Sequence, residues 1–181
     1  MKSEIKPYSA LSQMSNMHLI FLDRKSFPDS YTEKERSKMQ NYLEIVDSLW
    51  HHLSSQVKPE DNLVVALEGL SFASNGNSLI DISMATALLR ERIIERTGFD
   101  NFHVYSPTAV KKFAFKGNCK KDELYYALLQ KNEPGLEDFL NILRAGADSW
   151  ISPSKSVQKP LDDLIDATWI CLYLLASEKN N

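Results

Sequence analysis

The residues best suited to chemistry are three acids at the head of the last apolar segment. Asp162, Asp163 and Asp166 open the sequence LDDLIDATWICLYLLA, residues 161–176. Residues three apart share a helix face, so Asp163 and Asp166 would present two carboxylates together. Mg²⁺ is held by one or two such carboxylates together with substrate phosphates. These acids therefore predict a metal site, and the alternative is that they cap a helix whose N-terminus favours negative charge.

A further acid, Glu68, comes directly after the apolar segment NLVVAL, residues 62–67. This segment is apolar throughout, which predicts a strand covered on both faces. Unpaired buried acids are costly, so an acid that closes such a strand indicates a functional residue. The alternative is that Glu68 simply begins the following loop.

A lysine-rich stretch between these acids is the dense positive cluster of the sequence. Phe113 and Phe115 are interleaved with its lysines. Basic residues mixed with aromatic rings suit a phosphate backbone and unstacked bases. The alternative is a solvated helix face with Phe113 in the core. The lysines that we predict to contact nucleic acid are Lys111, Lys112, Lys116, Lys120 and Lys121.

Strands and helices must alternate to position these groups. Short runs of strand-forming residues predict strands at 18–23, 62–67 and 102–105. Helical spacing of apolar residues predicts a first helix, which begins at a capping box formed by Thr32 and Glu35. The same spacing predicts helices at 78–96, 122–130 and 161–176, and a short amphipathic segment at 136–143. Gly98 is predicted to end the second of these helices. The order indicates an α/β layer architecture.

Length and composition indicate one globular domain. The chain has 181 residues, of which 43% are apolar and 25% charged. We predict a loose arm at residues 1–16, a domain at 17–177 and a polar tail at 178–181. The net charge of −3 means that any nucleic-acid binding must come from a local patch.

The cysteines and the apolar runs indicate a cytoplasmic protein. Cys119 lies in a basic loop and Cys171 in the apolar helix, where we expect it in the core. We interpret both as reduced thiols of a cytosol-like compartment. The longest apolar run is too short to span a bilayer, and the first residues lack a secretory pattern, so we expect no membrane association.

Three motifs, taken in order, resemble a known family. ALEGLSFASNG, VYSPTAVKKFAFKGNCKKDEL and DDLIDATWICLYLL are similar to the RuvC-like branch of the ribonuclease H superfamily, with phage-encoded Holliday-junction resolvases the most similar members. The resemblance covers residues 19–176. It implies a mixed sheet flanked by helices and two-metal hydrolysis of a phosphodiester, in which one ion helps generate hydroxide and the other stabilises the leaving oxygen.

The resemblance also implies site residues. By position, Glu68 matches the family's second catalytic acid, and Asp163 and Asp166 match its closing pair, so these three would hold Mg²⁺ or, alternatively, Mn²⁺. Lys121 matches a catalytic-site lysine near the substrate phosphates. Phe72 lies in the loop that presents an aromatic side chain to the DNA junction in relatives.

One family feature is missing. The family opens with a strand bearing an aspartate that bridges both metals, whereas Asp23 follows a strand that matches the third one of the fold. We therefore expect this chain to lack the family's first strand, through a split gene, a late start or truncation, or a loss of catalysis. An absent central strand exposes unpaired edges, so we expect a homodimer or a partner chain that covers them.

The sequence thus predicts an α/β, ribonuclease H-like fold and a Mg²⁺-dependent endonuclease that resolves branched DNA, completed by a missing N-terminal segment or partner. The alternative is a non-catalytic module that binds nucleic acid or protein. The third option is a structural protein in which these acids only cap a helix.

Overall fold

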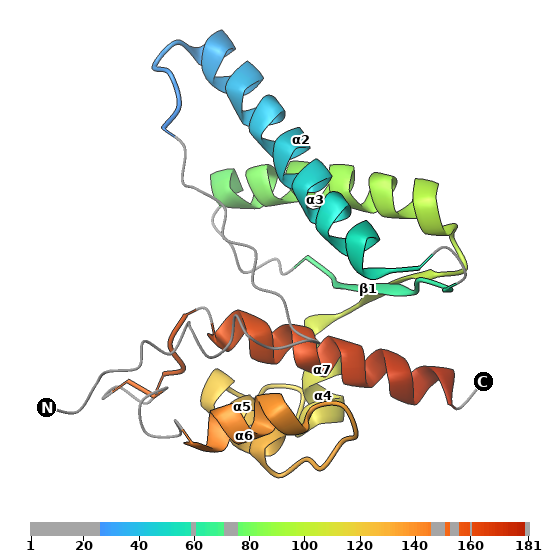
Figure 1. Ribbon diagram of the computed structural model, residues 1–181. Helices are drawn as coiled ribbons and strands as arrows, with labels where there is room; N and C mark the ends of the chain where they lie inside the picture. The colour runs from blue at the N-terminus through green and yellow to red at the C-terminus, as the bar shows by residue number, and fades with distance from the viewer. Residues whose placement is uncertain are drawn as a thin grey trace, which may run out of the picture. The chain divides into compact units, whose positions relative to one another are not determined.

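The computed structural model describes residues 26–58, 61–70, 76–145, 151–152, 156–159 and 161–179 (Figure 1). These residues form two compact units, an N-terminal unit that ends at Val104 and a C-terminal unit that begins at Tyr105. The described chain is mainly helical, with six helices and a small two-stranded parallel sheet. The predicted α/β class is therefore confirmed only in coarse form, because helices dominate.

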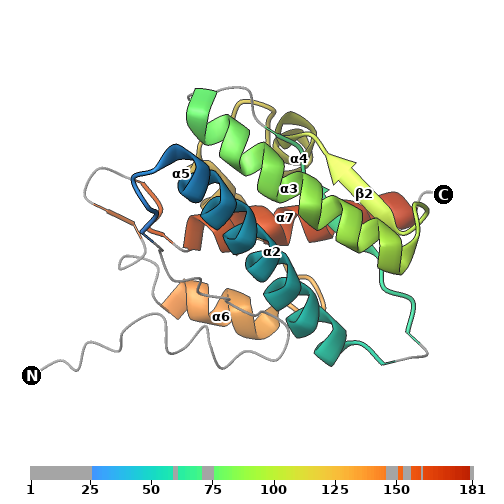
Figure 2. The same ribbon diagram turned by 90° about the horizontal axis from the view of Figure 1, so that it is seen from above.

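Two long helices, α2 (Tyr31–Gln56) and α3 (Gly76–Thr97), make up most of the N-terminal unit. They pack against each other in both views (Figures 1 and 2). Val46 and Ile93 are almost fully buried. The predicted capping box is wrong: Ser30 is the N-cap, and the Lys34 N–H donates to its carbonyl at 2.8 Å. This first bond of the ladder places Thr32 inside the helix.

The sheet consists of β1 (Val65–Glu68) and β2 (Phe102–Tyr105). The predicted range of β2 is confirmed, whereas β1 begins three residues later than the predicted start at residue 62. The apolar residues of β1, which alternate between its two faces, are half-buried, so the expected coverage of both faces is partial. Gly98 ends α3 as predicted, with φ of +80°, and its N–H donates to the Ile94 carbonyl at 2.9 Å.

The C-terminal unit is helical, and Figure 1 shows α4, α5 and α6 on one side of α7. Its helices are α4 (Pro107–Ala114), α5 (Lys121–Leu129), α6 (Glu137–Ala145) and α7 (Leu161–Glu178). The predicted helices at 122–130, 136–143 and 161–176 are confirmed within a few residues. Helix α4 was not predicted, although Ser106 caps it by accepting from the Ala109 N–H at 3.2 Å and Pro107 occupies its first position.

The core of the C-terminal unit holds α5 in place. Trp169 is fully buried, and its indole N–H donates to the Leu124 carbonyl at 3.2 Å. The Tyr125 hydroxyl donates to the Leu143 carbonyl at 3.1 Å. These bonds join α5 to α7 and to α6, so the start of α5 has a defined position beside α7. The fully buried side chains are Leu124, Tyr125, Leu128, Phe139, Leu140, Leu143, Leu161, Ile165 and Trp169.

Some predictions lie outside the described residues. They are the arm at residues 1–16, the strand at 18–23 with Asp23, and the loop that contains Phe72. The single domain at residues 17–177 stays a prediction. Across the described ranges, none of the helices has the length and apolar character needed to cross a membrane.

Candidate functional site

The carboxylates of Asp163 and Asp166 lie in the first two turns of α7 and are both paired with lysines. Asp163 is exposed, and the Lys159 ammonium lies 3.4 Å from its Oδ2. Asp166 is more enclosed, with 21% of its side chain exposed, and the Lys121 ammonium donates to its Oδ2. Asp162 is half-buried, and its Oδ1 accepts from the Asp163 N–H at 3.0 Å. The predicted ligands Asp163 and Asp166 are therefore both engaged in ion pairs. Asp162 accepts from a backbone N–H in the first turn, as the alternative role of these acids at a helix N-terminus predicts.

The pair formed by Lys121 and Asp166 brings together two residues that the sequence predicted for one site. Lys121 is the first residue of α5, and the two side chains are 45 positions apart in the chain. Lys121 is 38% exposed and can be reached from solvent. In this pair the ammonium and the carboxylate neutralise each other through a charge-assisted hydrogen bond.

The lysine segment, residues 111–121, runs from the end of α4 to the start of α5. Lys112 and Lys120 are exposed. The Lys116 ammonium pairs with Glu123 at 2.5 Å and lies 5.3 Å from the centroid of the Phe115 ring. Lysine ammonium groups therefore line an exposed surface on which an aromatic ring is also accessible.

Glu123 was not among the predicted site residues, and it compensates part of this positive charge. Its Oε2 accepts from the Lys120 N–H at 2.8 Å, while its other oxygen pairs with Lys116. The hydrogen bond from Lys116, followed by the one from the Lys120 backbone, lowers the pKa of the Glu123 carboxyl. The sequence carries a signal for this role, because Glu123 follows the N-cap residue Lys120 by three positions, the spacing of a capping box.

Phe113 and Phe115 differ in their surroundings. Phe113 packs near the core aromatic residues, with ring centroids 5.2 Å from Tyr173 and 6.1 Å from Trp169. Phe115 is 61% exposed. Phe113 thus contacts core aromatic residues, as expected if the lysine-rich stretch is a solvated helix face, but it is also partly exposed. Phe115 remains available to a ligand.

The third predicted metal ligand, Glu68, is the exposed last residue of β1 in the N-terminal unit. Asp163 and Asp166 belong to the C-terminal unit, so convergence of the three acids stays a prediction. Within the described ranges, no three His, Cys, Asp or Glu side chains form a group that could hold a metal ion.

The two cysteines differ in burial, and Cys171 differs from the prediction. Cys171 is exposed on α7, whereas Cys119, in the basic loop, is buried. The expectation that Cys171 belongs to the core is wrong because its position falls on the open side of α7, a fact that overall apolarity of a helix does not reveal. Both thiols are free, as predicted.

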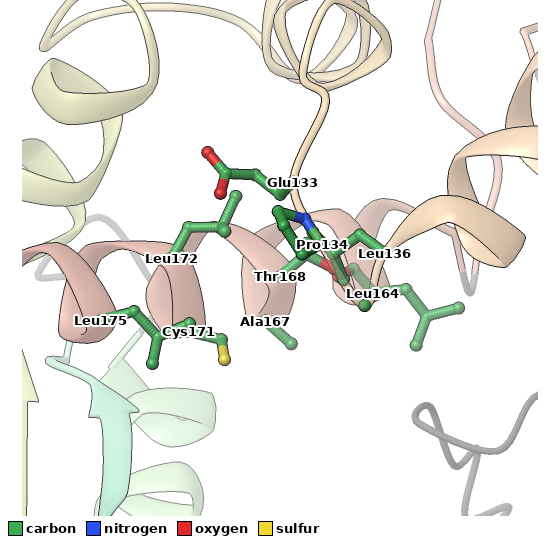
Figure 3. A pocket seen from close by; sticks show the side chains of 10 residues that line it. Glu133, Pro134, Leu136, Leu164, Ala167, Thr168, Cys171, Leu172 and Leu175 are labelled. Atoms are coloured by element: carbon green, nitrogen blue, oxygen red, sulfur yellow. The ribbon is translucent and has the colours of Figure 1, made fainter.

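Two hollows in the C-terminal unit were not predicted. One, of about 440 Å³, lies between residues 133–136 and α7, and Figure 3 shows Ala167, Cys171 and Leu175 along it. Its lining is mostly apolar, with Glu133 as its one acid, and it includes neither the predicted metal ligands nor the lysine segment. The other, of about 500 Å³, is lined by Phe115, Glu123, Tyr126, Ala127 and Gln130, next to the lysine segment.

No known protein family, curated protein or solved structure matches this chain. The resemblance to RuvC-like nucleases therefore rests on the motifs quoted above. What it implies about activity, metal and substrate is a proposal.

Proposed function

We propose that this chain is a RuvC-like endonuclease with a ribonuclease H-like fold, which uses Mg²⁺ to cleave branched DNA of the Holliday-junction type. The proposed metal ligands are Glu68, Asp163 and Asp166. Lys121 is the proposed catalytic-site lysine, and the remaining lysines of the lysine segment, with Phe72, contact the DNA.

The observation that carries this proposal is the ion pair of Lys121 with Asp166. These residues were predicted to bind a phosphate and a metal ion, respectively, and a phosphodiesterase needs both functions at one place. The ammonium can hold a phosphate oxygen of the substrate beside the carboxylate. The exposed lysines that precede Lys121 extend this positive surface along the path of a DNA backbone.

The donor atoms near Lys121 fit a hard divalent cation. Asp163 and Asp166 offer carboxylate oxygens from adjacent turns of α7, the ligand type that Mg²⁺ prefers. Both carboxylates carry ammonium partners, so a bound cation would replace Lys159 or Lys121 as the neutralising charge. When bound, such a cation lowers the pKa of a water molecule and stabilises the leaving oxygen. Lys121, released from Asp166, would then hold a substrate phosphate.

The test is a binding and cleavage assay on a four-way DNA junction with Mg²⁺ or Mn²⁺. We expect the chain alone to bind the junction but to cut it slowly, because we matched no aspartate of this sequence to the bridging one of the family. A ligand displaced by about 1 Å can cost on the order of 100-fold in rate. Addition of an N-terminal segment that bears a strand with an aspartate, in cis or in trans, should raise the cleavage rate strongly.

Three acid variants provide the controls. Glu68→Gln, Asp163→Asn and Asp166→Asn keep the shape of the side chain and remove its charge, so each should abolish the gain in cleavage. Cutting that survives Glu68→Gln and Asp166→Asn would show that the active site lies elsewhere. Cutting that also requires Asp23 would mean that its strand is the first one of the fold.

The proposal includes a homodimer or a partner chain that adds a strand to the sheet. The described sheet has two strands, and two-stranded sheets are at best marginally stable by themselves. Sedimentation velocity with and without the added segment measures the assembly. A monomer that cuts at full rate without the segment would contradict this part of the proposal.

The second candidate is a non-catalytic module that binds nucleic acid. It is favoured by the ion pairs of Asp163 with Lys159 and of Asp166 with Lys121, because they neutralise both carboxylates without a metal. If the chain is such a module, the Asp166→Asn variant still binds the junction, and neither the N-terminal segment nor a divalent ion produces cleavage. Thermal unfolding with and without Mg²⁺ separates the two candidates, since specific binding to the folded state raises the melting temperature.

A further inference from the structure

The second hollow of the C-terminal unit is built on the solvent face of α5. Glu123, Tyr126, Ala127 and Gln130 follow the spacing i, i+3, i+4, i+7, which places them on one side of the helix. Their neighbours Leu124, Tyr125 and Leu128 are buried on the other side. The core thus anchors α5 so that the hollow faces outward.

Two aromatic rings line this hollow and are accessible to solvent. Phe115 is 61% exposed and Tyr126 is 53% exposed. Tyr126 sits beside the buried Tyr125, with ring centroids 5.3 Å apart. Exposed aromatic rings in a hollow of about 500 Å³ provide flat faces within a site of the size that small organic groups occupy.

The charge around the hollow selects the occupant. The Lys116 ammonium lies 5.3 Å from the Phe115 ring centroid and pairs with Glu123. The negative charge of Glu123 is thereby compensated by Lys116 and by the Lys120 N–H. The exposed Lys112 and Lys120 of the same segment supply the net positive charge nearby, so a ligand that combines a flat aromatic group with a negative charge fits this arrangement, and a nucleotide of a single strand has both.

We infer that this hollow, lined by Phe115 and Tyr126, binds an unpaired nucleobase by stacking, while the neighbouring lysines bind the adjoining phosphates. The Gln130 amide offers one donor side and one acceptor side to the base edge. This inference rests on the proposed binding of DNA by the lysine segment. It adds that the chain prefers strands with unstacked bases, as at a branch or gap, over continuous duplex.

The test uses the full chain and an oligonucleotide with 2-aminopurine, measured as a single strand and as the matching duplex. Stacking on an aromatic ring changes the fluorescence of this base, and anisotropy of an end label gives the affinity. Phe115→Ala and Tyr126→Ala should each weaken single-strand binding about 5- to 150-fold. The salt dependence of binding should not change, because the phosphate contacts remain.

Two variants serve as controls. Tyr126→Phe keeps the ring and should retain both affinity and fluorescence change. Phe99→Ala removes an aromatic ring that is 77% exposed in the N-terminal unit and should also have no effect. All three positions lie on the surface, so circular dichroism should show that the four variants are folded.

The outcomes separate this inference from the proposed function. If Lys112→Ala weakens binding but Phe115→Ala and Tyr126→Ala do not, the stacking site is refuted and DNA binding stands. An equal loss for single strand and duplex would also refute base stacking. If the unmodified chain binds neither DNA, both the proposed function and this inference fail. An unchanged 2-aminopurine fluorescence on DNA binding would also refute base stacking, and it is the result expected if the hollow binds an aromatic side chain of a protein instead.

Discussion

The Lys121 ammonium binds the Asp166 carboxylate and so joins the first residue of α5 to the second turn of α7. Both side chains are partly shielded from water, which strengthens the pair relative to a fully exposed one. The contact places a cation from the lysine segment at the acidic start of α7. It is the structural relationship on which the proposed DNA-cleaving site depends.

A double-mutant cycle measures this coupling. Lys121→Met and Asp166→Asn should each lower the free energy of unfolding by about 1 kcal/mol, and the double variant should lose less than their sum. The measurement is urea unfolding at low and at high salt. Strictly additive losses at both salt concentrations would mean that the two side chains do not interact.

The lysine segment should govern the salt dependence of DNA binding. Lys112→Ala removes an exposed charge at the end of α4, so junction affinity should fall and the slope of log K against log salt should flatten by about 0.9 for a lost phosphate contact. Lys34→Ala, an exposed lysine of α2, is the matched control and should leave the slope as it is. An unaltered slope in Lys112→Ala would favour the solvated helix face.

Removal of Glu123 should have the opposite effect on DNA binding. Glu123→Gln releases Lys116 from its ion pair, so junction affinity should rise and the salt slope should steepen by up to about 0.9. Asp138→Asn, an equal charge change at an exposed position of α6, is the control. Affinities that rise equally in both variants would point to net charge rather than to Lys116.

The helix pair of the N-terminal unit should depend on pH through Asp81 and Lys38, whose side chains lie 3.0 Å apart. The hydrogen bond from Lys38 lowers the pKa of Asp81, so its stabilisation is complete above the unfolded value of about 3.9 and is lost as the pH falls through the folded value. The hydrogen bond to Asp81 raises the pKa of Lys38. That contribution is present below about 10.4 and is lost at higher pH.

Asp81→Asn should therefore lower the melting temperature at neutral pH and flatten its pH profile at both ends. Asp29→Asn, which removes an exposed carboxylate before α2, should leave the profile intact. Equal flattening in both variants would show that general charge repulsion, not this pair, sets the pH dependence.

Trp169 should dominate the stability of the C-terminal unit. Trp169→Ala removes a fully buried ring and should cost about 3–5 kcal/mol. Trp169→Phe keeps much of the ring but removes the indole N–H that donates to the Leu124 carbonyl, which should cost about 1 kcal/mol. Trp50→Phe, at a half-buried position of α2, should have a smaller effect. The measurement is denaturant unfolding, and a larger loss in Trp50→Phe than in Trp169→Phe would contradict this assignment.

Local signals in the sequence determined most element boundaries. Gly98 tolerates the positive φ that ends α3, and the strand-forming residues 102–105 form β2 as predicted. The apolar spacing of residues 161–176 is enough to predict α7, because helix formation depends on neighbours within one or two turns. The resemblance to RuvC-like nucleases also implied that Lys121 and Asp166 belong to one site.

Only the tertiary structure decided which side chains meet and which remain exposed. Lys121 and Asp166 are 45 residues apart, and their contact depends on how α5 and α7 pack. The same packing buries Tyr125 and leaves Tyr126 open, although the two residues are chemically alike and adjacent. It also exposes Cys171 in an otherwise apolar helix. Composition and periodicity describe the helix itself, whereas the neighbouring helices determine which of its faces water can reach.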